Sequence, residues 1–355
     1  MSAMGTRVTT TTQSKLMPYL IDTFLNSNVF ATRQIGAAKR WSGERMKFPI
    51  KWKGNITGTS FAGYDTFSTA ATDNRVNMEF VPKFYQITVT VPLDEVWVNN
   101  TDEKVMDLIG VEIVGSAQDM ANDIGTLFYS DGTGNGSKDF LGLEAIVDDG
   151  GDVATYGGLS RSTYTTIQGT DTASSGTITL AKMSTLYNAA SSGSQHPTCG
   201  FTTEAVFALY ESLLQPQERI AKDVAMIKRM GNMGKEGTGF QGGTGFTGLF
   251  FKGFPVLADE KCSSGELYFI NENYVDFFAL DPAKASKAGL AEAIPYKSVD
   301  IRGNDYSDMP GLGFCWSGWV KPTNSASIVG HVYLGGELIG SNPKRNAVLL
   351  DITSV

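Results

Sequence analysis

Residues 100–129 constrain the fold more than any other part of the chain, because they have the pattern of one long amphipathic helix. Thr101 is a favourable N-cap residue, and Asp102 and Glu103 place negative charge at the positive end of the helix dipole. Apolar residues recur every three or four positions: Val105, Ile109, Ile113, Ala117, Met120, Ile124 and Phe128. At 1.5 Å per residue this helix would be roughly 40 Å long, which is longer than most globular helices.

Three glycines lie inside this predicted helix, and each costs about 1 kcal/mol relative to alanine at an exposed helical position. They are Gly110, Gly115 and Gly125. We therefore expect packing against the rest of the protein, rather than intrinsic propensity, to hold the helix. The glycine-rich residues 131–137 predict that it ends in a hairpin, and the apolar residues 140–147 predict a short strand after it.

A long two-stranded hairpin is predicted before this helix. Every second residue from Met46 to Trp52 is apolar, and a return strand with flanking prolines is predicted over residues 80–91. The connecting residues 54–75 are rich in small residues and carry three aromatic ones: Phe61, Tyr64 and Phe67. Because an isolated hairpin is marginally stable in water, we expect this one to pack against another subunit.

The charge pattern suggests where the hairpin would pack. Residues 33–53 contain seven basic side chains and one acidic one, whereas residues 94–123 contain eight acidic side chains and one basic one. Opposite blocks of this kind fix register and steer association. We predict that the hairpin base of one subunit lies over the long helix of the next; the alternative is that both blocks are ordinary solvated faces. The predicted contact residues are basic and aromatic on the hairpin and acidic on the helix: Arg45, Lys47, Lys51, Lys53, Phe61, Tyr64, Phe67, Asp102, Glu103, Asp107, Glu112 and Asp119.

The rest of the chain mixes helices and short strands, which is typical of an α+β fold. Residues 16–30 could form a short helix interrupted by Pro18, and residues 148–177 are expected to be loop-rich. The remaining predictions are helices over 180–190 and 203–214, and strands over 249–251, 267–270, 327–334 and 347–352. The last two strands are expected to return to the sheet beside the long helix.

Three stretches carry a resemblance to a known family. The sequence YSDGTGNGS at residues 129–137, followed by Leu-Gly-Leu at 141–143, resembles the end of the spine helix and the hairpin after it in tailed-phage major capsid proteins of the Hong Kong 97 fold. Residues 156–162, and residues 253–259 running on to 268–271, agree with the family in the same order.

This resemblance implies a Hong Kong 97-like α+β fold with four parts. They are an N-terminal arm over residues 1–43, an extended loop over 44–92, a peripheral domain over 93–177 and 321–355, and an axial domain over 178–320. The peripheral domain would contain the spine helix, residues 101–129.

The resemblance further implies a major capsid protein that assembles into hexamers and pentamers of an icosahedral phage head around double-stranded DNA. The protein would be made in the host cytoplasm and become part of the virion. Its partners would be further copies of itself, a separate scaffolding protein, a portal and, in some phages, a decoration protein. A net charge of −8 predicts only weak, nonspecific DNA contact. The alternative is an encapsulin-type shell around cargo enzymes.

The sequence predicts no catalytic, cofactor-binding or metal-binding residue. Its two histidines, His196 and His331, lack neighbours at metal-ligand spacing, and no nucleophile elbow is present. An enzyme reading would need one of them as its base. Residues 132–136 follow a helix, whereas a dinucleotide loop follows a strand. The acidic residues 148–152 lack EF-hand spacing, so we expect a solvated acidic turn there.

Two further expectations come from residue usage. Three cysteines far apart in sequence, Cys199, Cys262 and Cys315, favour free thiols in a reducing compartment, and no apolar run is long enough to span a membrane. Some capsid proteins of this family cross-link through a lysine near the tip of the extended loop. Residues 54–75 contain no lysine, so we expect no covalent cross-linking.

Overall fold

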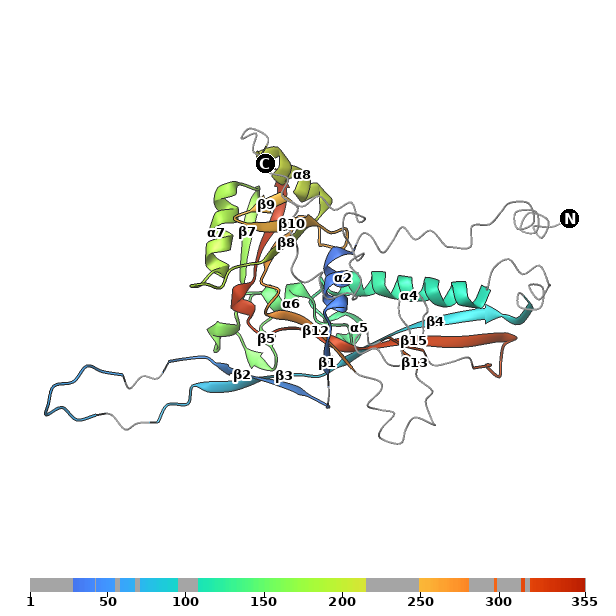
Figure 1. Ribbon diagram of the computed structural model, residues 1–355, viewed down its shortest axis with the longest axis horizontal. Coiled ribbons are helices and arrows are strands. Elements are labelled where there is room, and N and C mark those ends of the chain that lie inside the picture. The colour runs from blue at the N-terminus through green and yellow to red at the C-terminus, as the bar shows by residue number, and fades with distance from the viewer. Residues whose placement is uncertain are drawn as a thin grey trace, which may run out of the picture.

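The protein has an α+β fold with a long projecting hairpin, as a computed structural model shows (Figure 1). The residues that the structure describes are 28–41, 43–54, 58–67, 71–94, 108–214, 249–280, 297–298, 314–316 and 320–354. In this part of the chain the strands form two six-stranded sheets and two two-stranded ones. The hairpin extends to one side of the body, and α4, β4 and β15 extend to the other (Figure 1). The predicted α+β class is confirmed.

The predicted long helix is present as α4 (Leu108–Leu127), and the residues before it that were predicted to be helical lie outside the described part. At 1.5 Å per residue, α4 is about 30 Å long. Met120, Ile124 and Phe128 are fully buried, as the helical periodicity predicts. Within the described residues, no helix combines the length and apolar character that crossing a membrane requires.

One of the helix glycines is explained by packing. A Cβ atom at Gly125 would lie 2.5 Å from the side-chain nitrogen of Asn28, so any other residue here would displace the Asn28 side chain, which lies just before α2 (Val29–Gly36). At Gly115, a Cβ atom would meet no described atom within 4 Å, so packing does not account for that glycine. Gly110 is in α4, but its surroundings lie outside the described residues.

The first six-stranded sheet is built around β15 (Ser327–Gly340). Its first part pairs antiparallel with β4 (Lys83–Pro92) and its last part with β12 (Val275–Leu280). The helix α4 packs against β4, whose inward residues Val89 and Val91 are buried. The strand predicted over 327–334 is therefore confirmed beside α4. Three short strands complete this sheet: β1 (Lys39–Trp41), β13 (Lys297–Ser298) and β14 (Phe314–Trp316).

The second six-stranded sheet carries α7 (Leu180–Ala190) and α8 (Glu204–Leu214), both predicted from the sequence. Their apolar faces share one core with the strands beneath them. The strands, in spatial order, are β7 (Thr170–Thr177), β16 (Ala347–Ser354), β11 (Leu267–Ile270), β8 (Cys199–Thr202), β10 (Phe254–Ala258) and β9 (Leu249–Phe251). The strands predicted over 249–251 and 267–270 are confirmed.

Two predictions about this sheet are wrong. The strand expected over 347–352 does not return beside α4, because β16 lies in the second sheet between β7 and β11. The segment 148–177 was expected to be loop-rich, yet it ends in the eight-residue strand β7. The strand β16 buries Ala347, Val348 and Leu349, and its backbone groups require partners on both sides. The strand β7 is one of the two strands that pair with β16. It consists mainly of small polar residues, so it lacks the apolar alternation that would have predicted a strand.

The segment after α4 also differs from its prediction. Residues 134–137 form a tight turn, α5 (Gly134–Ser137), with left-handed backbone at Asn135 and Gly136, rather than a hairpin between strands. The apolar run is the helix α6 (Leu143–Val147), not a strand. A Cβ atom at Gly142 would lie 2.4 Å from the carbonyl oxygen of Ser130. The backbone at residue 142 therefore packs directly against the backbone at the end of α4. Every residue of α6 except Glu144 is apolar and buried, so this short run has no periodicity that separates strand from helix.

The return strand of the hairpin is divided in two. The strand β2 (Met46–Lys51) pairs with β3 (Arg75–Phe80), whereas β4 begins at Lys83 and joins the first sheet. Pro82 lies between them and has no backbone N–H to donate to a ladder. We call β2, β3 and residues 52–74 between them the extended hairpin. Smaller elements lie beside it or in the connections: β5 (Thr155–Tyr156), β6 (Leu159–Ser160), η1 (Thr165–Ile167) and η5 (Pro343–Arg345).

A buried carboxylate joins three of these elements. Asp259, which is 1% exposed, accepts hydrogen bonds from the backbone N–H of Phe30 at 2.8 Å and from the Tyr129 hydroxyl at 3.0 Å. The backbone N–H of Lys261 donates to it as well, at 3.0 Å. These bonds connect the start of α2, the end of α4 and the end of β10. Burial raises the pKa of Asp259, and the bonds it accepts oppose that rise.

Asp259→Ala should lower the free energy of unfolding by about 2–4 kcal/mol, because three buried donors lose their acceptor. Urea denaturation measures this change. Asp119→Ala, at an exposed position on α4, is the matched control and should change stability by less than about 0.5 kcal/mol. Equal denaturation midpoints for the two variants would contradict this role of Asp259.

Candidate subunit interface

Aromatic packing fixes the root of the extended hairpin to the body. One face of β2 and β3 is apolar, and Met78 and Phe80 on it are buried. The Phe48 ring lies edge-on to Phe80 at 5.9 Å and to Phe278 of β12 at 5.8 Å. The backbone N–H of Glu79 donates to the carbonyl oxygen of Gly157 at 2.9 Å. The root is therefore part of the folded body.

The tip of the extended hairpin is exposed. The side chains of Phe61, Tyr64 and Phe67 are 66%, 104% and 63% exposed, and they are among the most exposed large apolar residues in the described chain. Phe61 and Phe67 contact each other with ring centroids 5.0 Å apart, and the Asp65 carboxylate accepts from the backbone N–H of Ala62. Three aromatic rings gathered on a projecting loop form the kind of apolar patch that marks an interaction site.

Much of the predicted basic block has partners inside the chain. Glu79 accepts from Lys47 at 2.9 Å and from Arg45 at 3.3 Å across the two hairpin strands, and these bonds lower the pKa of Glu79. Further along the block, Arg33 binds Glu272 at 2.6 Å and Lys39 binds Asp276 at 2.5 Å. Four of the seven basic side chains are therefore already matched within the chain.

Two other basic residues of the block, Lys51 and Lys53, take no part in these ion pairs. Lys51 is exposed, and the ammonium group of Lys53 lies 4.3 Å from the centre of the Trp52 ring. Sequence reasoning missed Glu79, because the return strand was expected to begin at residue 80. The strand register, with Lys47 opposite Glu79, is the signal that would have found it.

Part of the predicted acidic block can be placed. Asp119 and Asp123 are exposed on α4. The Tyr85 hydroxyl of β4 donates to Asp123 at 2.9 Å, and burial together with this carboxylate raises the pKa of Tyr85 to about 12. Asp102, Glu103 and Asp107, and the side chain of Glu112, lie outside the described residues. Contact between the two blocks of different subunits stays a prediction.

The two histidines make structural contacts. The His196 ring stacks on Tyr187 at 5.6 Å, and Tyr187 stacks in turn on Phe254 at 5.8 Å. The His331 Nδ1 atom lies 3.0 Å from the Thr88 hydroxyl oxygen across the β4–β15 pair. Cys199 and Cys262 are buried free thiols, as predicted, and burial raises the pKa of both.

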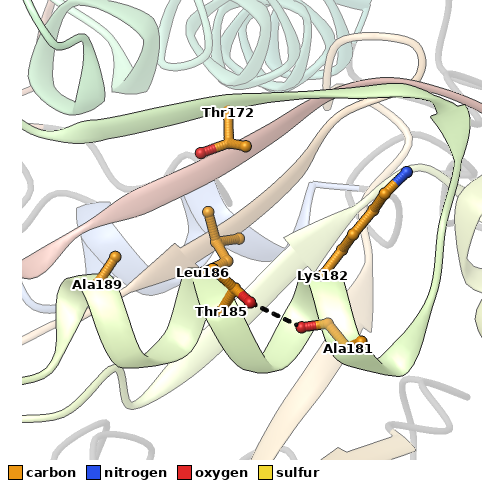
Figure 2. A pocket seen from close by; sticks show the side chains of 6 residues that line it. All are labelled: Thr172, Ala181, Lys182, Thr185, Leu186 and Ala189. Carbon is orange, nitrogen blue, oxygen red and sulfur yellow. Dashed lines mark hydrogen bonds between the residues drawn. The ribbon is translucent and has the colours of Figure 1, made fainter.

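A small hollow of about 210 Å³ lies between α7 and β7 (Figure 2). Its lining is mainly aliphatic, with two hydroxyls and one ammonium group, from Thr172, Ala181, Lys182, Thr185, Leu186 and Ala189. The Thr185 hydroxyl donates to the carbonyl oxygen of Ala181, and Lys182 donates to that of Thr177. These six residues supply no carboxylate, imidazole or thiol, and the ammonium group of Lys182 is hydrogen-bonded to the backbone.

The acidic turn after α6 is solvated at Asp149 and Asp152, as expected, whereas Asp148 is buried in an ion pair that was not expected. Asp148 is buried and accepts from Arg161 at 2.7 Å and from the backbone N–H groups of Gly150 and Asp152. Arg161 is fully buried and also donates to the carbonyl oxygen of Ala145. The carboxylates of Asp148, Asp149 and Asp171 approach within 4.8 Å of one another. Arg161 supplies the positive charge for the buried member of this cluster.

Arg161→Met should lower the free energy of unfolding by about 3 kcal/mol, because it leaves the Asp148 carboxylate buried without its cation. Chemical denaturation measures the loss. Arg75→Met, at an exposed position on β3, is the control and should stay close to wild type. A loss no greater than that of the control would show that the ion pair does not stabilise the fold.

Comparison with known proteins identifies the fold. No protein-family model and no curated protein sequence matches the chain. Among solved structures, a chain of the cyanophage A-1(L) capsid asymmetric unit matches with a TM-score of 0.66 and 16% identity, covering 96% of this chain and 97% of that one. The capsid of Myoviridae phage XM1 matches with a TM-score of 0.55 and 10% identity, covering 95% and 96%. The chain has the Hong Kong 97 fold.

One further matching structure is an encapsulin rather than a phage capsid. The holo-SrpI encapsulin complex from Synechococcus elongatus PCC 7942 matches with a TM-score of 0.58 and 10% identity, covering 99% of this chain and 96% of that one. All three matches span nearly the whole chain, so the extended hairpin and both sheets belong to one Hong Kong 97 fold. The predicted division into arm, extended loop, peripheral domain and axial domain stays a prediction.

Proposed function

We propose that this protein is the major capsid protein of a tailed bacteriophage. Copies of it assemble into hexamers and pentamers that tile an icosahedral head around double-stranded DNA. The Hong Kong 97 fold and its likeness to capsid structures support this function. The observation that carries it is the extended hairpin, which projects from the body (Figure 1). Its tip carries three exposed aromatic side chains.

The hairpin requires a surface that its own chain does not provide. Its root is packed on β12 and on the turn at Gly157, whereas its tip has only the Phe61–Phe67 contact among described residues to shield apolar area. Burying an aromatic side chain stabilises a complex by about 1.5–3 kcal/mol, so three tip residues offer a substantial driving force to a neighbouring subunit. Folding of the hairpin is therefore completed by assembly.

The role is structural, and its partners follow from it. Further copies of this chain supply the main contacts, and a separate scaffolding protein, a portal and, in some phages, a decoration protein complete the head. Contact with DNA is weak and nonspecific, because the chain carries a net charge of −8. The protein is made in the host cytoplasm and ends in the virion.

Expression of the chain alone, followed by size-exclusion chromatography and negative-stain microscopy, tests the proposal. Closed shells, tubes or capsomer rings are the expected products. If only monomers form, the experiment is repeated with the scaffolding protein encoded beside it. A monomer under both conditions would contradict the proposed function.

Tip variants test the role of the hairpin directly. Phe61→Ser, Tyr64→Ser and Phe67→Ser together should abolish assembly while leaving the circular dichroism spectrum and denaturation midpoint of the monomer unchanged, because all three side chains are solvent-exposed in the subunit.

The matched control replaces the same three residues by leucine, which keeps the apolar area, and this variant should still assemble. Normal shells from the serine variant would show that the tip does not dock on a neighbour.

Charge reversal tests the predicted contact between hairpin and α4. Lys51→Glu with Lys53→Glu should weaken assembly strongly, and added Asp119→Lys should restore part of it, because all three side chains lie outside the ion pairs of the basic block. Lys47 is left unchanged, since it binds Glu79. Light scattering at low and high salt measures assembly. Absence of any rescue by Asp119→Lys would rule out this pairing.

A second candidate is an encapsulin-type shell that encloses cargo enzymes, which the likeness to the SrpI encapsulin complex favours. Both functions use the same shell geometry, so only the particle contents separate them. Particles purified from the native source should contain double-stranded DNA if the chain is a phage capsid protein. A stoichiometric enclosed protein in place of DNA would favour the encapsulin candidate.

A further inference from the structure

A buried glutamate lies where the extended hairpin meets the body. Glu337 of β15 is 1% exposed and follows Gly336, the residue at which β15 changes its partner from β4 to β12. Its Oε1 atom accepts from the backbone N–H of Leu141 at 2.5 Å. The carboxylate therefore connects β15 to the segment that follows α4.

Lys83 completes the same junction from the hairpin side. It is the first residue of β4 and comes three residues after the end of β3, so it lies at the root of the extended hairpin. Its ammonium group donates to the carbonyl oxygens of Asp139 and Gly132 and lies 3.9 Å from Glu337. Four segments thus meet at one buried carboxylate and one cation.

We propose that Glu337 and Lys83 form a proton-controlled latch that fixes the root of the extended hairpin against the end of α4. In the closed latch, the Glu337 carboxylate is buried between its own strand, β15, and the segment at Leu141. In the open latch, its carboxylate reaches water, and the hairpin root is released from the turn at residues 132–141.

Charge controls the latch because the buried carboxylate is costly to ionise. Burial raises the pKa of Glu337 to about 8, although Lys83 and the backbone N–H groups of Leu141 and Leu338 offset part of the rise. In water a glutamate titrates near 4.3. The pKa of Glu337 is therefore higher in the closed latch than in the open one. As a result, the closed latch has its full stability relative to the open one below about pH 4, and this stability is lost as the pH rises through about 8. The open fraction should rise roughly tenfold per pH unit between these limits.

The other ionisable groups around Glu337 have their own partners. Asp131 is bound by Thr133, which lowers the pKa of Asp131, and Asp276 on β12 is bound by Lys39. Tyr156 hydrogen-bonds to Gly340, and burial raises the pKa of its hydroxyl. Asp139 contributes its backbone carbonyl to Lys83. The pKa of Glu337, at about 8, lies close to neutral pH.

Hydrogen exchange of the Leu141 amide tests the latch in the full-length chain between pH 5 and 9, after division by the intrinsic exchange rate at each pH. Protection should fall steeply with pH in the wild type. In Glu337→Gln, whose amide oxygen still accepts from Leu141 but does not ionise, protection should be independent of pH. The Met183 amide in α7 reports global opening and should not follow the Leu141 profile.

Two further variants keep the test decisive. Glu79→Gln removes an exposed carboxylate from the same hairpin and should retain the wild-type profile of Leu141. Lys83→Met removes the nearby cation, so it should raise the pKa of Glu337 in the closed latch and extend the loss of protection to higher pH. A flat wild-type profile, an unchanged profile in Glu337→Gln, or an unmoved upper limit of the loss in Lys83→Met would overturn the latch.

Discussion

The C-terminal end of α4 joins the two sheets, and the rest of the structure depends on this contact. The Phe128 ring packs on Phe277 of the first sheet at 5.3 Å, and the Tyr129 ring packs on Tyr268 of the second at 5.8 Å. Phe30 of α2 lies against both helix residues and against Phe201 of β8. This seam between the two sheets consists of aromatic rings, and the buried carboxylate of Asp259 accepts a hydrogen bond from the Tyr129 hydroxyl.

This seam explains how the folded body can carry a hairpin whose tip is not packed against it. The body has two buried cores, one around α4 and one beneath α7 and α8, so it does not depend on the tip for stability. The hairpin root is anchored by Phe48, and Lys83, which follows the hairpin, lies 3.9 Å from Glu337. In the proposed function, a neighbouring subunit supplies the surface that the tip requires. The arrangement suits a shell in which each subunit completes the next.

Much of the fold was predictable because local patterns were strong. The 3.6-residue period of α4 and the apolar spacing of α7 and α8 identified these helices, and alternation identified β2. Where a partner rather than a pattern decides the structure, prediction failed. The strand β7 consists of small polar residues and exists because β16 pairs with it. In α6, every residue except Glu144 is apolar and buried, so the short run has no periodicity that identifies a helix. The candidate interface was predicted in its exposed aromatic residues, whereas the matching of Arg45 and Lys47 by Glu79 required the strand register.

The sequence by itself determined the long helix, the projecting hairpin with its aromatic tip, and the sparse use of histidine and cysteine that led away from catalysis. These features are local, since each depends on spacing within one segment or on composition. Only the tertiary structure decided which strands share a sheet, and which charges are buried. Asp148 with Arg161, Asp259 with Tyr129 and Glu337 with Lys83 bring together residues 13, 130 and 254 positions apart. Their energies come from desolvation and contact, which arise only when the chain has folded.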